Sequence, residues 1–466
     1  MKIIIIAIFL LMELFGFLLE FLNYKNRNAP LPENVKDVYD EETYTKKTAY
    51  EMDNLRLRII SGICGLGIML AVLAFNLHYF FFDLLNIESL YLRVYFMFAM
   101  VSLISLPLGI LFGAIKTFKI EAKYGFNKST VGTFIGDIVK QQLIMGVVVL
   151  GLLSLFMLLH GALDNWVFLI FFFVLVAVML FIVFFMHFFS KIFNKFTPIE
   201  EGSLKEKIDA LAIKTNFPVK RVFSMDASRR STKLNAYFTG FGRNRTIVLY
   251  DTLIEKFTEE EVISVLAHEI GHAKKRHTLI SMPMSFSVMA LLLLAAYFVV
   301  NQGAISTAFG FTELNIAFNL FVLMILASPV LTLLQIPRMA VSRAFEYTAD
   351  AYETRYAGKK TAISALKKLY REDYGNLTPH PFVVLIRHSH PTLTQRIAGI
   401  EAVDDNVIEA VEAEEAEEAE DTPTPTDEAE NTPAPTDEAE NAPAPTDETK
   451  STPVPVEDPP AAEDTE

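Results

Sequence analysis

Residues 166–189 read WVFLIFFFVLVAVMLFIVFFMHFF, a stretch of 24 residues without Asp, Glu, Lys or Arg. A helix needs about 20 predominantly apolar residues to cross the hydrocarbon core of a bilayer, so this stretch predicts a membrane-spanning helix. Hydrophobic residues make up 52% of the 466-residue chain, which exceeds the share typical of a soluble enzyme. We therefore expect a mainly α-helical protein embedded in a membrane.

Six further apolar stretches flank this one and are also long enough to cross a bilayer. The first of them carries Glu13 and Glu20 and is not followed by a small-residue cleavage site, so we expect a retained span and not a signal peptide. The expected spans are therefore about seven, at roughly 3–22, 59–82, 95–115, 141–160, 166–189, 279–300 and 315–336.

Lys and Arg gather in alternate loops between these stretches. The segments after the first, third, fifth and seventh spans are basic, whereas those after the second, fourth and sixth hold almost no Lys or Arg. Because basic loops remain on the cytoplasmic side, we expect the segment 190–278 and the C-terminus to be cytoplasmic. The host membrane is the endoplasmic reticulum in a eukaryote or the inner or plasma membrane in a bacterium.

The composition changes at Glu401. From there to the end, 24 acidic residues stand against one lysine, which is −23 of a total net charge of −14, so the first 400 residues carry +9. Near-repeats such as DTPTPTDEAE and NTPAPTDEAE are rich in Pro and like charges, which prevents a packed core. We expect three parts: helices and loops over 1–190, a metallopeptidase domain with the last two spans over 191–400, and a disordered tail over 401–466.

Residues 268–272 read His-Glu-Ile-Gly-His. Two histidines four residues apart lie on one helix face, and the Glu beside the first can reach a water bound to the same metal. A helix is indicated because Thr258 and Glu261 form a capping-box pattern and an apolar stripe follows. The alternative is that two surface histidines share this spacing by coincidence.

A catalytic zinc site takes three protein ligands and leaves a position for water. The best third ligand is Glu346, with Asp350 one turn later to fix a ligand histidine by a hydrogen bond. The alternative is that Glu346 pairs with Arg343 on a solvated helix face. We favour the ligand role because the same membrane face also carries His268 and His272. His277, past the ligand face, is expected to be a cation at the helix end.

Six segments together resemble the type I CAAX prenyl proteases, which are integral-membrane zinc endopeptidases. The resemblance covers roughly residues 1–400 and rests on YGFNKST (124–130), FTPIEEGSLKEKI (196–208), LNAYFTGFGRNRTIVLYDTLI (234–254), LAHEIGHAKKRH (266–277), SRAFEYTAD (342–350) and HSHPTLTQRI (388–397). It implies seven helices around a water-filled chamber within the membrane, with a zincin-type protease domain closing one end.

The resemblance also implies a role for each site residue. One Zn²⁺ would be held by His268, His272 and Glu346, with Glu269 as general base and Asp350 behind the ligands. His390 would donate to the oxyanion of the tetrahedral intermediate, with His388 as the alternative donor. Asn235 would hydrogen-bond the substrate backbone beside an edge strand that takes the peptide.

We therefore predict a zinc-dependent metalloendopeptidase that cleaves membrane-associated proteins, near their C-termini if these are prenylated CAAX-type substrates. The expected partners are the peptide substrate and the bilayer, and no nucleic acid. Two alternatives stay open: a quality-control protease for misfolded membrane proteins, and a catalytically silent scaffold or transporter. The presence of Glu269 argues against a catalytically silent protein. A transporter is expected to show internal repeats in its sequence, and we find none among the spans.

Overall fold

The computed structural model describes residues 1–404, apart from residues 86 and 240–244 and the side chains of residues 186 and 187. The chain divides into two compact units, and all described residues belong to the first, Met1–Glu415. Residues 405–466, which make up most of the predicted acidic tail, lie outside the described part. The predicted tail and the predicted division of the first 400 residues at residue 190 stay predictions.

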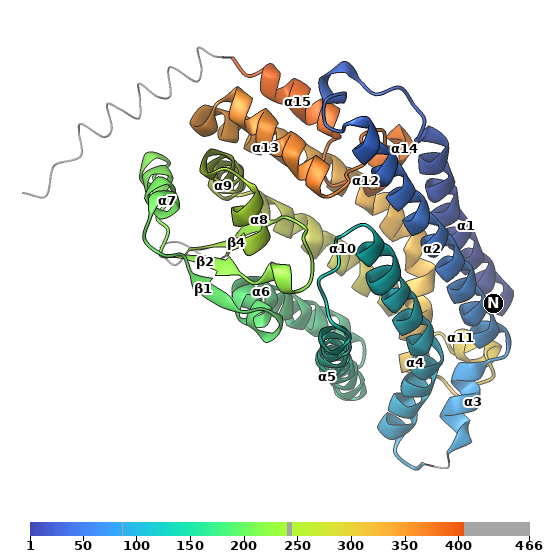
Figure 1. Ribbon diagram of the computed structural model, residues 1–466. Coiled ribbons are helices and arrows are strands. Elements are labelled where there is room, and N and C mark those ends of the chain that lie inside the picture. Colours follow the sequence, from blue (N-terminus) through green and yellow to red (C-terminus); the bar gives the residue numbers. More distant parts are fainter. Residues whose placement is uncertain (86, 240–244, 405–466) are drawn as a thin grey trace, which may run out of the picture. The chain divides into compact units, whose positions relative to one another are not determined.

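Seven long helices dominate the described residues (Figure 1). Six apolar segments are long enough to span a membrane, and one of them, Val131–Phe185, contains two helices. The prediction of about seven spans is therefore confirmed. The helices are α1 (Lys2–Asn26), α2 (Glu41–Ala74), α4 (Leu90–Ala114), α5 (Val131–Leu163), α6 (Val167–Phe193), α10 (His277–Val300) and α12 (Ile316–Ala357).

Helices α5 and α6 form an antiparallel hairpin. The short turn η3 (Asp164–Trp166) joins them. Near the open end of the hairpin, Lys140 Nζ donates to the Ile192 carbonyl oxygen at 3.1 Å. Near the turn, the rings of Phe156 and Phe168 meet with their centroids 5.8 Å apart. Contacts at both ends establish that the two helices run side by side over their full length.

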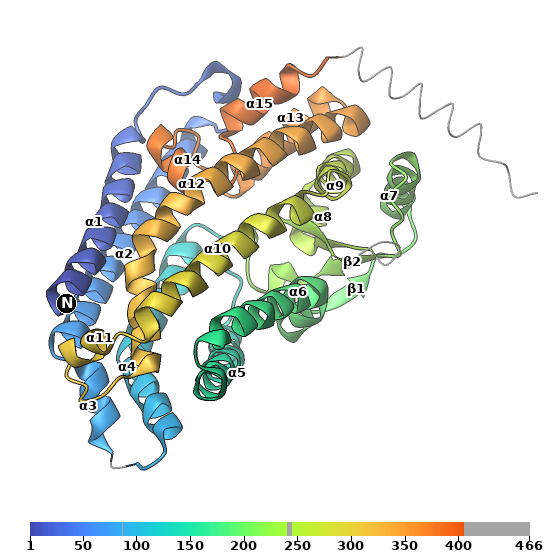
Figure 2. The same ribbon diagram turned by 180° about the vertical axis from the view of Figure 1, so that it is seen from behind.

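The long helices follow one another around a ring (Figures 1 and 2). Each contacts the next in the order α4, α2, α1, α12, α10, α6 and α5. A hydrogen bond between the hydroxyls of Tyr95 on α4 and Ser154 on α5 closes the circuit. Only 6–33% of the most apolar stretch of each span is buried, as expected for helices with lipid outside. The ring is the arrangement implied for helices around a chamber, and its water-filled interior stays a prediction.

Two helix boundaries differ from the sequence prediction. The predicted span 59–82 ends early, because Asn76 adopts a left-handed conformation with φ 55° and separates α2 from α3 (Leu77–Leu84). The helix of the last span continues past the predicted span end near residue 336. Helix α12 runs on through Pro329 and Pro337 to Ala357, and proline is tolerated in membrane helices because neighbouring groups satisfy the freed carbonyls. For example, the Ser328 hydroxyl donates at 2.7 Å to the Ile325 carbonyl oxygen, which Pro329 leaves without an amide donor.

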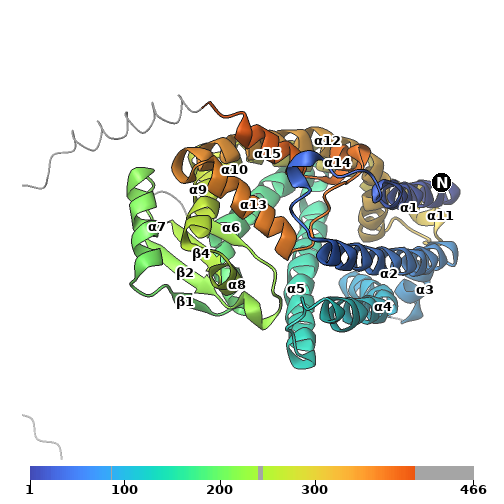
Figure 3. The ribbon, with the colours of Figure 1, turned by 45° about the horizontal axis from the view of Figure 1, so that its top comes forward.

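Most of the remaining elements form a domain at one end of the ring (Figure 3), whereas α11 (Gly303–Ala308) packs near the start of α1. Its four-stranded sheet has the order β1-β2-β4-β3, in which only the β2–β4 pair is parallel. The strands are β1 (Phe196–Pro198), β2 (Arg221–Met225), β3 (Ala236–Thr239) and β4 (Thr246–Tyr250). The shorter helices are η1 (Glu33–Val35), the π-helix η2 (Ile115–Glu121), α7 (Ser203–Lys214), η4 (Ala227–Arg229), α8 (Asp251–Lys256), α9 (Glu259–Lys274), α11 (Gly303–Ala308), α13 (Lys359–Glu372), α14 (Pro381–Arg387) and α15 (Leu393–Glu401).

Helix α9 begins as the sequence predicts. The Thr258 hydroxyl accepts from the Glu261 amide at 3.3 Å, and the Glu261 carboxylate accepts from the Thr258 amide at 3.1 Å. This reciprocal cap satisfies two of the amide groups that a helix start leaves without partners. The apolar side of α9 then joins the main core of the domain, with Leu266 and Ile270 packed among residues of β4 and α8. The opposite side of α9 is left to face α12.

Candidate metal centre

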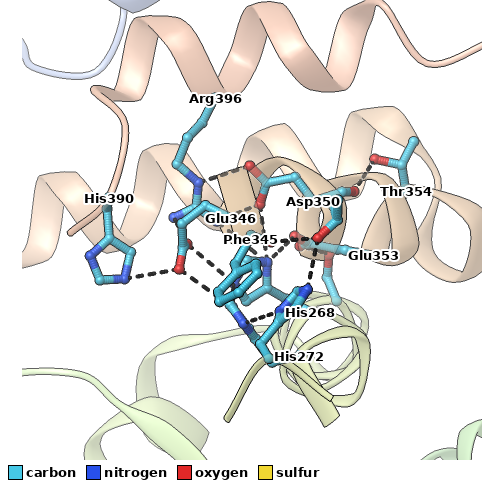
Figure 4. Close-up of polar contacts among 12 residues, drawn as sticks. His268, His272, Phe345, Glu346, Asp350, Glu353, Thr354, His390 and Arg396 are labelled. Carbon is cyan, nitrogen blue, oxygen red and sulfur yellow. Dashed lines mark hydrogen bonds and ion pairs between the residues drawn. The ribbon is translucent and has the colours of Figure 1, made fainter. Parts of the chain in front are cut away.

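Helix α9 presents His268 and His272 on the same face, as their spacing predicts (Figure 4). Their Nε2 atoms lie 3.1 Å apart. Two imidazole nitrogens this close have no mutual role when both are unprotonated, because each then offers only a lone pair. A shared cation between them would satisfy both lone pairs.

Helix α12 supplies the third group. The carboxylate of Glu346 lies 3.5 Å from His268 Nε2 and 3.4 Å from His272 Nε2. Four ligands at zinc bonding distance in a tetrahedron are separated by about 3.3 Å, so the three observed separations match the edges of such a tetrahedron. Glu346 is buried, and its Oε2 atom accepts no hydrogen bond. A buried, unsatisfied carboxylate oxygen beside two imidazoles fits a cation site.

Gly271 allows α9 and α12 to approach closely enough for this geometry. A Cβ atom at Gly271 would stand 3.0 Å from Tyr352 Cβ and 3.2 Å from the Ala349 Cα of α12. Both separations are shorter than ordinary carbon–carbon contact at 3.5–4.0 Å. The spacing of the two helices, and with it the distance from the histidines to Glu346, therefore depends on a residue without a side chain.

His268 is oriented from its other ring nitrogen. His268 Nδ1 lies 3.0 Å from the Asp350 carboxylate and 3.5 Å from that of Glu353. An Nδ1–H that donates to a carboxylate fixes the tautomer and leaves Nε2 free for a metal. Asp350 thus takes the position that the sequence predicts for it, one turn after Glu346.

The same acids and His268 also lie close enough together to form an alternative metal-binding set, His268, Asp350 and Glu353. Arg396 argues against a cation there, because its guanidinium forms two hydrogen bonds with Asp350, one of them at 2.9 Å. The Glu353 carboxylate is also engaged, since it accepts from the buried Ser264 hydroxyl at 2.6 Å. The group of His268, His272 and Glu346 is therefore the better metal site.

His277 does not act as the helix-end cation expected from sequence. It is buried, and its Nδ1 lies 2.9 Å from His272 Nδ1 while its Nε2 lies 3.0 Å from the Thr348 hydroxyl. Its ring stacks on Phe345 at 4.1 Å with an interplanar angle of 9°. Arg276 adopts a left-handed conformation with φ 57° between α9 and α10, and this turn places His277 against His272. His277 therefore holds the ring of His272 in place.

Glu269 lines a cavity of about 450 Å³. Asn235, Glu346 and His390 also line this cavity. Burial raises the pKa of the Glu269 carboxyl above its usual value. A raised pKa makes a carboxylate a stronger base near neutral pH. The cavity therefore brings together a basic carboxylate, the candidate metal ligands and room for a peptide segment.

His390 and Asn235 approach this cavity from two sides. His390 Nε2 lies 3.3 Å from Glu346 Oε1, and its Nδ1 contacts the Ser389 hydroxyl at 2.9 Å (Figure 4). His388 also lines the cavity, but Arg343 binds its carbonyl oxygen at 2.9 Å. Asn235 is exposed immediately before β3, which forms one edge of the sheet. The structure thus brings all seven site residues predicted from sequence to one cavity or directly behind it.

Arg396, Glu353 and His277 are the supporting residues that sequence reasoning missed. Glu353 follows Glu346 by seven residues, two helical turns, and this spacing was a usable signal. Arg396 lies within the segment 388–397, but nothing in the spacing indicates that it reaches Asp350. The contact between His277 and His272 could be predicted only with knowledge of the turn at Arg276.

Two family models together match nearly the whole described chain. The model described as CAAX prenyl protease N-terminal, five membrane helices, matches residues 20–195, and the model of peptidase family M48 matches residues 198–404. The second range contains every proposed metal ligand and Glu269.

Curated relatives and a solved structure show the same likeness. The chain is 31% identical over 415 residues to the CAAX prenyl protease 1 homolog of Oryza sativa subsp. japonica, which covers 86% of this chain and 97% of the relative. It is 28% identical to CAAX prenyl protease 1 of Saccharomyces cerevisiae, over 82% of this chain and 90% of that protein. The crystal structure of S. mikatae Ste24p superimposes with a TM-score of 0.81 at 26% identity, covering 86% of this chain and 98% of that one.

Proposed function

Because this chain belongs to the CAAX prenyl protease 1 family within peptidase family M48, we propose that it cleaves prenylated proteins near their C-termini. The family membership, the fold class and the enzyme class predicted from sequence are confirmed: the chain is a multi-pass membrane metalloendopeptidase. Zinc as the metal, the ligand set, the prenylated substrate and the cytoplasmic placement of the catalytic segment are parts of our proposal.

The observation that carries the proposal is the triangle of ligand atoms from His268, His272 and Glu346, with separations of 3.1–3.5 Å. Two imidazoles and one carboxylate are a donor set that binds zinc in hydrolytic enzymes. When bound, the ion polarises the scissile carbonyl and acidifies water. His277 holds the ring of His272, and Asp350 holds the ring of His268.

The other residues of the site transfer the proton, stabilise the developing negative charge and bind the peptide. The Glu269 carboxylate accepts the proton of the attacking water and returns it to the leaving amine. The imidazole of His390 donates a hydrogen bond where negative charge develops on the carbonyl oxygen, which lowers the barrier because the donor is already in place. The free edge of β3 offers backbone groups that pair with an extended peptide, and Asn235 stands where that peptide enters.

The proposal is tested with purified full-length protein and a peptide farnesylated close to its C-terminus. Wild type is expected to cleave it, and a zinc chelator is expected to stop cleavage. Glu269→Gln is expected to bind zinc as wild type does and to cleave at least about 100-fold more slowly, the usual loss when a general base is removed. Equal cleavage by this variant would remove Glu269 from the mechanism.

The substrate range is decided in the same assay. A matched peptide without the farnesyl group and a misfolded membrane protein are offered in parallel. Preference for the farnesylated peptide supports the proposal. Cleavage confined to the unprenylated membrane protein would favour the quality-control function instead.

A further inference from the structure

A short segment leads from the membrane helices to the catalytic cavity. Residues 230–235 join η4 to β3, and we call this segment the strap. Its first residue is tied to α5, because the Arg230 guanidinium donates to the Asp137 carboxylate at 2.7 and 3.0 Å. Its last residue is Asn235, which lines the cavity and is proposed to hydrogen-bond the substrate. The path of the strap therefore decides where Asn235 stands.

The loop after the π-helix η2 holds the middle of the strap. This loop contains the motif YGFNKST (124–130), which has no part in the mechanism proposed above. The Thr232 amide donates to the Phe126 carbonyl oxygen at 3.1 Å, and the Lys128 amide donates to the Arg230 carbonyl oxygen at 3.0 Å. An antiparallel bridge lies between these two bonds. The motif thus supplies a short antiparallel partner for the strap.

An aromatic cluster lies beside the next residue of the strap, Lys233. The rings of Tyr50, Phe126 and Tyr374 lie with their centroids 5.0–5.7 Å apart. They come from α2, from the motif loop and from the loop after α13. The Lys233 ammonium lies 5.4 Å from the centroid of the Phe126 ring and 6.0 Å from that of the Tyr50 ring. At this distance the electron-rich face of a ring attracts a cation.

Two hydrogen bonds support this position of Lys233. The Tyr50 hydroxyl donates to the Glu121 carboxylate at 2.8 Å, and donation to an anion makes the face of the tyrosine ring more negative. The Thr252 hydroxyl donates to the Lys233 carbonyl oxygen at 2.8 Å. The side chain and the backbone of Lys233 are therefore held by different elements, and both contacts fix the strap two residues before Asn235.

The side chain of Asn235 is oriented for donation. Its Oδ1 accepts from the Ala236 amide at 2.9 Å, and its backbone carbonyl oxygen accepts from the Tyr250 amide at 3.1 Å. With Oδ1 engaged, the side-chain NH₂ group is available to a carbonyl oxygen of a bound peptide. One residue separates Lys233 from Asn235, so a displacement of Lys233 moves Asn235 as well.

We propose that Lys233 is a positioning residue, whose contact with the rings of Tyr50 and Phe126 fixes the strap so that Asn235 meets the substrate backbone. Lys233 does not line the cavity, and it acts through Asn235. The proposal rests on the proposed function and adds how the same site holds its substrate. Without a cation over the rings the strap shifts, and the substrate binds more weakly while the groups that break the bond stay in place.

The kinetic test compares Lys233→Met with Lys233→Arg in the full-length protein, with the farnesylated peptide as substrate. Lys233→Met is expected to raise KM about 3- to 30-fold, the range for a cation–π contact. The kcat should stay nearly unchanged, because binding energy shared by substrate and transition state affects KM alone. Lys233→Arg keeps a cation over the rings and is expected to restore most of the wild-type KM. Lys128→Met is the matched control, because it removes the same charge from an exposed lysine of the motif loop.

A double variant separates positioning from a general loss of structure. In the Asn235→Ala protein, adding Lys233→Met is expected to raise KM no further, because the effect of Lys233 passes through Asn235. A further rise of the same factor in this background would show independent effects and overturn the proposal. A fall in kcat at unchanged KM also overturns it, as does an equal rise in KM for Lys128→Met.

Hydrogen exchange measured by mass spectrometry examines the strap without catalysis. The amides of residues 230–238 are expected to exchange several-fold faster in Lys233→Met than in wild type or in Lys128→Met. Unchanged exchange in Lys233→Met overturns the proposal even where KM rises. If the wild-type protein cleaves no farnesylated peptide, the proposed function fails, and the exchange rates still decide whether Lys233 fixes the strap.

Discussion

Gly271→Ala should weaken metal binding without touching any metal ligand. The added methyl group would start 3.0 Å from Tyr352 Cβ and 3.2 Å from the Ala349 Cα, and ordinary contact requires 3.5–4.0 Å. Helices α9 and α12 must therefore separate by about 0.5 Å. Metal–ligand distances tolerate only about 0.2 Å, so Glu346 can no longer meet both histidines at bonding distance.

The expected size of the effect follows from this displacement. We expect the zinc dissociation constant to rise about 10- to 100-fold, the range seen when groups that position ligands are altered, or about 1.4–2.8 kcal/mol. Stability of the metal-free protein should change less, because overpacking costs about 1–3 kcal/mol while replacing a helical glycine by alanine returns up to about 1 kcal/mol.

Zinc affinity is measured by competition with a chelator of known affinity, alongside peptide cleavage at several free zinc concentrations. Gly136→Ala in α5 is the control, since a Cβ there meets nothing within 4 Å. Activity of Gly271→Ala should recover in part as free zinc increases, which distinguishes a weakened site from a misfolded protein. A Gly271→Ala protein with wild-type zinc affinity would refute the link between helix spacing and ligand geometry.

Three further predictions concern other buried polar groups. Asp350→Asn removes a charge that faces both His268 and Arg396, so zinc affinity in the competition assay should fall about 10- to 100-fold; an unchanged affinity would mean that Asp350 does not position His268. Asn319→Leu deprives the Val300 and Gln302 carbonyl oxygens of a buried donor and should cost about 2 kcal/mol or more, seen as a lower thermal midpoint in detergent. Arg230→Gln breaks a two-bond pair with Asp137 on α5 and should increase proteolysis at the junction between α6 and β1, whereas the exposed Arg229→Gln should not.

The membrane helices and the paired histidines were predictable because each depends on local sequence. A span requires only length and apolarity, and His268 and His272 require only the period of a helix. The break at Asn76 was not predictable, since an asparagine in a left-handed conformation leaves no pattern like that of proline. The continuity of α12 was not predictable from apolarity, because the helix runs on where the apolar stretch ends.

The supporting contacts of the site could not be read from the sequence. Glu20 lies in the first span, Arg58 in the second helix and Arg387 near the C-terminal end of the protease region, and only the folded chain joins them. Arg396 reaches Asp350 across 46 residues, and His277 reaches His272 through the turn at Arg276. Such contacts depend on tertiary packing. The spacing of residues along one helix or strand does not predict them.

The continuity of α12 fixes how far the proposed metal ligand Glu346 lies beyond the predicted span. The expected apolar span ends near residue 336, and Glu346 stands ten residues further along the same helix. At 1.5 Å per residue, Glu346 lies about 15 Å further along the helix axis than residue 336. A lipid chain attached to a substrate can remain among the acyl chains while the bond to be cut is raised into hydrated surroundings. The continuous helix thus separates the place where a substrate is retained from the place where it is cut.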